Sequence, residues 1–179
     1  MERKNILLIN GSASAQSANQ QLIGQLAFLI KDDFAIKMSP DLKLLPHFSP
    51  ELSVTNTPEA VINFREEVAT ADGVIICTPE YIFSIPSGLK NALEWCVAAP
   101  VFTGKPLGII TASANGQKGH AELQLILQTL MANFTPGTTL LIPGIKGKVD
   151  AQGQITDAAT IEALLQFLKA FESLAHQDT

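Results

Sequence analysis

The sequence has few cysteines, no surplus of basic residues and no long apolar run. Its two cysteines, Cys77 and Cys96, lack the C-x-x-C spacing of a redox dithiol or zinc site and are too few for a disulfide framework. A formal net charge of -5 leaves no basic surplus to neutralise a nucleic-acid backbone. No window reaches the length of a membrane span, and the apolar run Ile6–Ile9 is too short for a signal peptide. We therefore expect a cytoplasmic protein that binds neither nucleic acid nor membrane.

Two common nucleotide-binding motifs and a metal motif are also missing. The G-x-G-x-x-G fingerprint of dinucleotide sites does not occur, and neither does the lysine-containing P-loop. The histidines His47, His120 and His176 are scattered, without the spacing of metal ligands, so no metal site is predicted. For His120 we expect a solvated position at the start of a helix.

The composition is that of a compact globular protein. Of the 179 residues, 46% are hydrophobic and 16% are charged, enough apolar material to bury a core without disulfides or metals. The chain has no internal repeat and no linker-like segment. We expect one domain over residues 1–179.

Short apolar segments rich in β-branched residues alternate with segments of helical periodicity. The predicted strands are 5–9, 34–38, 74–77, 107–112 and 138–142. Helices are predicted from Ala18, after Thr57 as the cap, after Pro86, after the loop 113–119, and from Asp157 to about Ala175. Residues 39–56 have no sustained period and are predicted to be irregular. This alternation predicts a three-layer α/β/α sandwich with a parallel sheet.

Polar loops follow the first, third and fourth predicted strands. In a sheet of order 2-1-3-4-5 these strands are neighbours, so their loops can form one pocket at the carboxyl ends. The first loop contains Ser12, Ser14, Ser17 and Asn19 directly before a helix. Such residues can simply cap a helix, but one cap needs only one of them. Hydroxyls beside the positive end of a helix dipole favour a phosphate monoester, and thus a mononucleotide.

Two motifs resemble those of a known family. The first loop reads G-S-x-x-x-x-S-x-N, and the segment 79–95 resembles the signature P-E-Y-N-x-S-x-P-G-x-L-K-N-x-x-D-W of the NADPH-dependent FMN reductase family. The second motif is long and specific, and the likeness covers nearly the whole chain. The resemblance implies a flavodoxin-like fold with a five-stranded parallel sheet of order 2-1-3-4-5. It also implies bound FMN, NAD(P)H as co-substrate, reduction of quinones or similar small acceptors, and a homodimer or homotetramer.

The resemblance also implies site residues at the matching positions. Ser12, Ser14, Ser17 and Asn19, with Gln20 just inside the helix, match positions around the FMN phosphate. Those that match positions around the flavin ring are Pro79, Glu80, Tyr81, Ile82 and Ser113. Flavin chemistry needs no catalytic side chain here, and none is predicted. Lys90 and Asn91 are expected to hold the helix and loop together, and Trp95 is expected in the core or an interface.

The chain departs from the family pattern at three positions. Ser14 stands where many relatives carry an arginine, Ile82 replaces the usual asparagine, and Glu122 lies near a frequent arginine position. The loss of arginine at Ser14 removes a charge-assisted contact to phosphate. Two alternatives therefore stay open beside the enzyme: a flavodoxin-type electron carrier and an FMN-free regulatory descendant.

Overall fold

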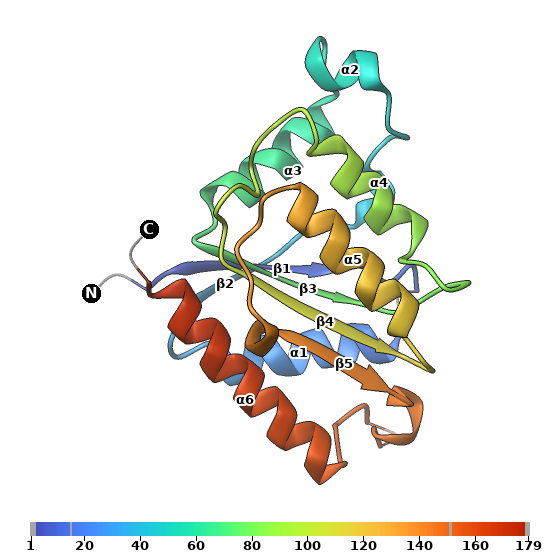
Figure 1. The fold of residues 1–179 in the computed structure, drawn as a ribbon, viewed down its shortest axis with the longest axis vertical. Helices are drawn as coiled ribbons and strands as arrows, with labels where there is room; N and C mark the ends of the chain where they lie inside the picture. Colours follow the sequence, from blue (N-terminus) through green and yellow to red (C-terminus); the bar gives the residue numbers. More distant parts are fainter. Residues whose placement is uncertain (1–2, 15, 151, 178–179) are drawn as a thin grey trace.

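The chain folds around a parallel sheet of five strands (Figure 1). The computed structural model describes residues 3–14, 16–150 and 152–177. The strands pair in the order β2-β1-β3-β4-β5, and all four pairings are parallel. The predicted fold class and strand order are therefore confirmed. The strands span Asn5–Asn10 (β1), Ala35–Met38 (β2), Gly73–Thr78 (β3), Leu107–Ser113 (β4) and Thr139–Pro143 (β5).

Helices cover both faces of the sheet. The α-helices span Ala18–Ile30 (α1), Pro50–Val54 (α2), Glu59–Thr70 (α3), Ser87–Trp95 (α4), Gln117–Thr129 (α5) and Ala158–Ala175 (α6). Short 3-10 turns span Leu42–Leu44 (η1), Pro136–Thr138 (η2) and Ile145–Gly147 (η3). Apolar side chains of α3, α4 and α5 form one core against the sheet, and those of α1 and α6 form another on the opposite face (Figure 1). Every residue of β3 is buried, because both faces of this strand are covered.

Several predicted elements differ from those in the structure. The segment 39–56 contains α2, whose five residues are too few for a helical period to appear in the sequence. The N-cap of α3 is Pro58 rather than Thr57, and no side chain caps this helix. Within the described ranges, no helix is both long and apolar enough to cross a membrane.

The turn after β1 fixes the start of the first loop. Gly11 donates its N–H to the Cys77 carbonyl at 2.8 Å and so extends the pairing of β1 with β3. A Cβ atom at Gly11 would lie 2.5 Å from Thr78 Oγ1 and 2.8 Å from Leu89 Cδ2. Only glycine, which has no Cβ atom, lets Thr78 of β3 and Leu89 of α4 approach the start of the loop this closely.

Candidate functional site

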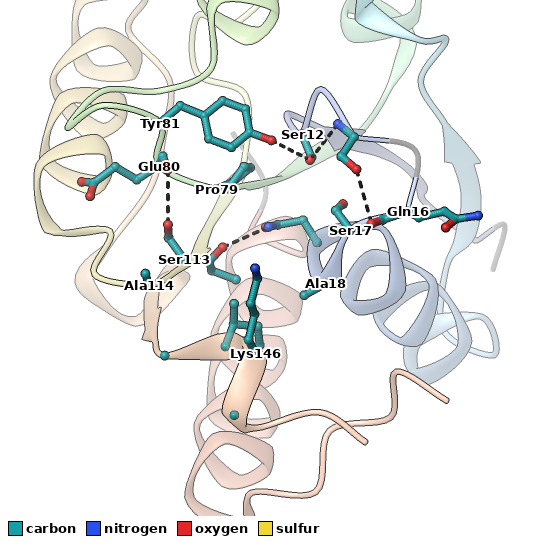
Figure 2. A pocket seen from close by; sticks show the side chains of 16 residues that line it. Ser12, Gln16, Ser17, Ala18, Pro79, Glu80, Tyr81, Ser113, Ala114 and Lys146 are labelled. Carbon is teal, nitrogen blue, oxygen red and sulfur yellow. Dashed lines mark hydrogen bonds between the residues drawn. The ribbon is translucent and has the colours of Figure 1, made fainter. Parts of the chain in front are cut away.

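A cavity of about 630 Å³ opens at the carboxyl ends of the strands. It is lined by the loops at the carboxyl ends of four strands and by the first turn of α1 (Figure 2). The lining residues are Ser12, Ser14 and Gln16–Asn19 after β1, Pro79–Tyr81 after β3, Ala112–Ala114 at the end of β4, and Gly144–Gly147 after β5. This volume lies in the range of cofactor sites. The loops after β1, β3 and β4 meet in one pocket, as the strand order predicts.

The first turn of α1 presents backbone donors that have no acceptor inside the helix. Ser17 is the N-cap of this helix, and its Oγ accepts the N–H of Gln20 at 3.1 Å. The N–H groups of Ala18 and Asn19, the first two helical residues, have no acceptor inside the helix. These donors and the positive end of the helix dipole suit an anionic group such as phosphate.

Asn19 is buried, and its side chain is engaged in structural hydrogen bonds. Its Nδ2 donates to the Ala112 carbonyl at 2.9 Å, and its Oδ1 lies 3.3 Å from the Cys77 thiol. Burial raises the pKa of this thiol, so it stays protonated and can donate to Oδ1. The amide thus ties α1 to β3 and β4, and the backbone N–H of Asn19 faces no acceptor inside the helix.

Glu80 braces the opposite side of the cavity and directs its carboxylate away from it (Figure 2). The two carboxylate oxygens accept the N–H groups of Gly116 and Gly119 at 3.2 and 2.8 Å. The predicted loop 113–119 is therefore shorter than expected, because α5 begins at Gln117 with Gly116 as its N-cap. A carboxylate at this helix end is also favoured by the dipole.

Residues Tyr81–Ser84 form a tight hairpin at the mouth of the cavity. Tyr81 N–H donates to the Ser84 carbonyl at 2.9 Å, and Ser84 N–H donates back at 3.1 Å. Ile82 and Phe83 have φ angles of 50° and 59°, as in a type I′ turn. A β-branched residue is strained in this region, whereas asparagine tolerates it. The family signature has asparagine at the Ile82 position, so this departure places strain at the tip.

Glu122 holds the base of the same hairpin. One of its carboxylate oxygens accepts the Ser84 hydroxyl at 2.7 Å and the Ile85 N–H at 3.1 Å. The other lies 4.0 Å from Lys90 Nζ. Glu122, which differs from the arginine expected near this position, therefore has a structural role in this chain.

Asn91 and Trp95, at the end of the segment 79–95, hold the segment 46–48 in place by hydrogen bonds. Trp95 is fully buried, and its Nε1 donates to the Pro46 carbonyl at 2.8 Å. Asn91 donates to the same carbonyl and accepts the N–H of Phe48. Trp95 thus lies in the core, and Asn91 joins helix to loop, both in line with expectation.

Most of the predicted site residues line the cavity. They are Ser12, Ser14, Ser17, Asn19, Pro79, Glu80, Tyr81 and Ser113. Gln20 lies outside it, because its Oε1 accepts from Asn10 Nδ2 at 2.6 Å. Ile82 also lies outside it, with 94% of its surface exposed at the hairpin tip.

The turn after β5 belongs to the site although the sequence did not predict it. Gly144–Gly147 form a wall of the cavity and bring Lys146 to it (Figure 2). The segment contains no motif, and its only signal was a lysine soon after the last predicted strand. That strand lies at the edge next to β4, so its loop reaches the same pocket.

We expected a solvated position for His120, and this prediction was wrong. The side chain is half-buried. Its Nδ1 lies 2.8 Å from Thr111 Oγ1, and burial lowers the pKa of the imidazole. Among residues 3–14, 16–150 and 152–177, no cluster of histidine, cysteine or carboxylate side chains could hold a metal ion.

Known proteins have sequences similar to that of this chain. Residues 4–146 match the family described as NADPH-dependent FMN reductase. An NAD(P)H-dependent FMN reductase of Pseudomonas aeruginosa is 32% identical over 173 residues, which cover 93% of this chain and 92% of the relative. A quinone reductase of Escherichia coli is 30% identical over 179 residues, covering 95% and 94%.

A solved structure supports the fold. FerB, a flavoenzyme NAD(P)H:(acceptor) oxidoreductase from Paracoccus denitrificans, superposes with a TM-score of 0.77 at 24% identity and covers 96% of this chain and 97% of its own. The family match and the two curated relatives confirm the predicted oxidoreductase activity, with FMN as cofactor and NAD(P)H as co-substrate, and they do not favour the electron-carrier or FMN-free alternatives. Because the family match covers about four-fifths of its length, the chain belongs to the NADPH-dependent FMN reductase family.

Proposed function

We propose that the cavity binds FMN and that the protein uses it to reduce a quinone or similar small acceptor with NAD(P)H. One observation carries this proposal: a single cavity joins the first N–H groups of α1, which have no acceptor inside the helix, to the apolar and aromatic wall after β3. FMN has the same two-part chemistry, with a phosphate at one end and a flat ring at the other. The donor set and the volume therefore fit this cofactor.

The phosphate is proposed to lie at the first turn of α1. Ser12, Ser14 and Ser17 supply hydroxyls there, and Ala18 and Asn19 supply backbone N–H groups. The side chains of Asn19 and Gln20 are engaged with Ala112 and Asn10, so we assign them a positioning role.

The flavin ring is proposed to lie between Pro79–Tyr81 and Ser113. The Ser113 hydroxyl donates to the Glu80 carbonyl at 3.4 Å, which fixes the loops after β3 and β4 relative to each other. The Tyr81 hydroxyl lies 3.3 Å from Ser12 Oγ and joins the ring end to the phosphate end (Figure 2). Because the Tyr81 N–H is used within the hairpin, it is not a donor for the ring.

The reaction requires positioning rather than acid–base catalysis by the protein. FMN, when bound, supplies the acceptance and donation of hydride. The chain's own residues orient the ring, hold the phosphate and exclude water from one side of the cavity. No side chain is proposed as a general acid or base.

Three further proposals concern the molecule as a whole. We propose a single domain over residues 1–179, supported by one sheet with a core on each face. A homodimer or homotetramer is supported by the exposed apolar side chains of Tyr81, Ile82 and Phe83 at the cavity mouth, which a second copy would cover. A cytoplasmic location is supported by two free, buried cysteines. Light scattering tests the oligomer.

The activity is tested with FMN-loaded protein under anaerobic conditions. Addition of NADPH or NADH is expected to bleach the flavin absorbance, and subsequent addition of benzoquinone is expected to restore it over repeated cycles. Free FMN at the same concentration is the control for reaction without protein. If the flavin stays bound and oxidised with both nucleotides, the proposed activity is wrong.

A further inference from the structure

The turn after β5 holds a lysine at the cavity wall. Ile145 is buried in the core of α1 and α6, with only 4% of its surface exposed. Gly144 N–H donates to the Ala114 carbonyl at 3.1 Å, and Gly147 N–H donates back to Gly144. The turn is thus anchored on both sides of Lys146. Its side chain extends from the turn into the space between Ser113 and Ala18 (Figure 2).

Lys146 is the sole basic side chain among the sixteen described residues that line the cavity. The loop after β1 has none, because its lining residues Ser12, Ser14, Gln16 and Ser17 are uncharged. None of the ion pairs between residues of the described ranges includes Lys146. The one carboxylate of the lining, on Glu80, is engaged by Gly116 and Gly119. The ammonium group is therefore available for an anionic ligand.

A phosphate at the first turn of α1 needs a counter-charge. The helix terminus provides only about half an elementary charge, whereas a phosphate monoester carries nearly two at neutral pH. Hydroxyls such as those of Ser12 and Ser17 donate hydrogen bonds without adding charge. A lysine serves as a compact point charge on a flexible stem, which allows it to reach the phosphate from another loop.

We infer that Lys146 binds the FMN phosphate and supplies, from the turn after β5, the positive charge that the loop after β1 lacks. This inference rests on the proposed function, since it assigns one more residue to the same cofactor. It predicts that the affinity contributed by Lys146 depends on the phosphate and not on the flavin ring. It also predicts that an arginine at position 14 can take over the task.

The test compares FMN with riboflavin, which lacks the phosphate. Dissociation constants for both flavins are measured by fluorescence quenching for the wild type, Lys146→Gln and the double variant Ser14→Arg/Lys146→Gln. Lys146→Gln is expected to weaken FMN binding by about 10- to 100-fold and to leave riboflavin binding within about twofold. The double variant is expected to regain most of the FMN affinity. Lys169→Gln, on the exposed side of α6, removes the same charge and is expected to change neither constant.

The remaining outcomes separate this inference from the proposed function. If the wild type binds FMN and Lys146→Gln binds it equally well, Lys146 does not hold the phosphate and the inference is wrong. An equal loss for FMN and riboflavin contradicts it too, because the lysine would then act on the ring. A wild type that binds neither flavin overturns the proposed function together with the inference. Thermal unfolding by circular dichroism checks that each variant is folded.

Discussion

The two walls of the cavity are built in different ways. At the first turn of α1, Ser17 caps the helix and leaves the N–H groups of Ala18 and Asn19 without acceptors inside it. On the side of the hairpin Tyr81–Ser84, by contrast, the polar groups bind one another. The Glu80 carboxylate accepts the first N–H groups of α5, Glu122 accepts the Ser84 hydroxyl, and the hairpin closes its own backbone bonds. The donors at the helix end have no partner inside the helix and can bind a ligand, whereas those of the hairpin form hydrogen bonds within the protein. Affinity for an anion should therefore reside at the first wall and rigidity at the second.

Among the substitutions that test this contrast, removal of the Glu80 carboxylate is expected to change the free energy of unfolding most. Glu80→Ala leaves the N–H groups of Gly116 and Gly119 without their acceptors and should lower the free energy of unfolding by about 3 kcal/mol. Urea unfolding measures this loss. Glu66→Ala, an exposed carboxylate on α3, is the matched control and should change stability by less than about 0.5 kcal/mol. Equal midpoints for the two variants would show that the hairpin wall does not depend on Glu80.

The next largest effect is expected at Asn19. Asn19→Ala removes the amide that joins α1 to Ala112 and Cys77 and should destabilise the protein by about 1–3 kcal/mol. Gln20→Ala, which removes an exposed amide one residue further along, should cost less than about 0.5 kcal/mol. If Asn19→Ala keeps full stability in urea but loses FMN affinity, its amide binds the phosphate and our positioning role is wrong.

Relief of strain at the hairpin tip should raise stability. Ile82→Asn places a residue that tolerates positive φ where a β-branched one now stands and is expected to add about 1 kcal/mol. Ile82→Val retains the branched side chain and serves as the control, with an unchanged midpoint of thermal unfolding. A destabilised Ile82→Asn variant would mean that Ile82 makes contacts that outweigh its backbone strain, such as those with a second copy of the chain.

The smallest expected effect is a pH dependence from His120, which lies beside the hairpin wall. Burial lowers the pKa of this imidazole in the folded protein, so protons bind more readily to the unfolded chain. Its contribution to stability is complete above the unfolded pKa of about 6.5 and is lost as the pH falls below it. The wild type should therefore lose more stability than His120→Gln between about pH 7.5 and about pH 5.5 in urea unfolding. His47→Gln, in an exposed segment, should behave like the wild type.

The fold could be predicted because its central strands carry strong local signals. β1, β3 and β4 are continuous apolar runs that need no knowledge of their neighbours to be identified. Shorter features depended on tertiary context. The five-residue helix α2 has no measurable period, and the start of α5 depends on the Glu80 carboxylate, which reaches its first turn from a distant loop.

Part of the site could be predicted because it follows strands with strong local signals. The loops after β1 and β3 directly follow identifiable strands and carry family motifs, so their residues meet in the cavity. Lys146 could not be predicted, because its position depends on where β5 joins the sheet and on the burial of Ile145. The outward directions of Gln20 and Ile82 follow from a hydrogen bond to Asn10 and from a positive φ angle, and no motif reveals either.

The central claim is that one wall binds the phosphate of FMN and the other borders its ring. Amide NMR spectra of the protein titrated with FMN and with riboflavin test it directly, because hydrogen bonds to phosphate shift amide protons strongly. We predict that FMN shifts the signals of Ala18 and Asn19 as well as those of Glu80 and Ser113, whereas riboflavin shifts only the second pair. Equal shifts of Ala18 and Asn19 with both flavins would contradict the account.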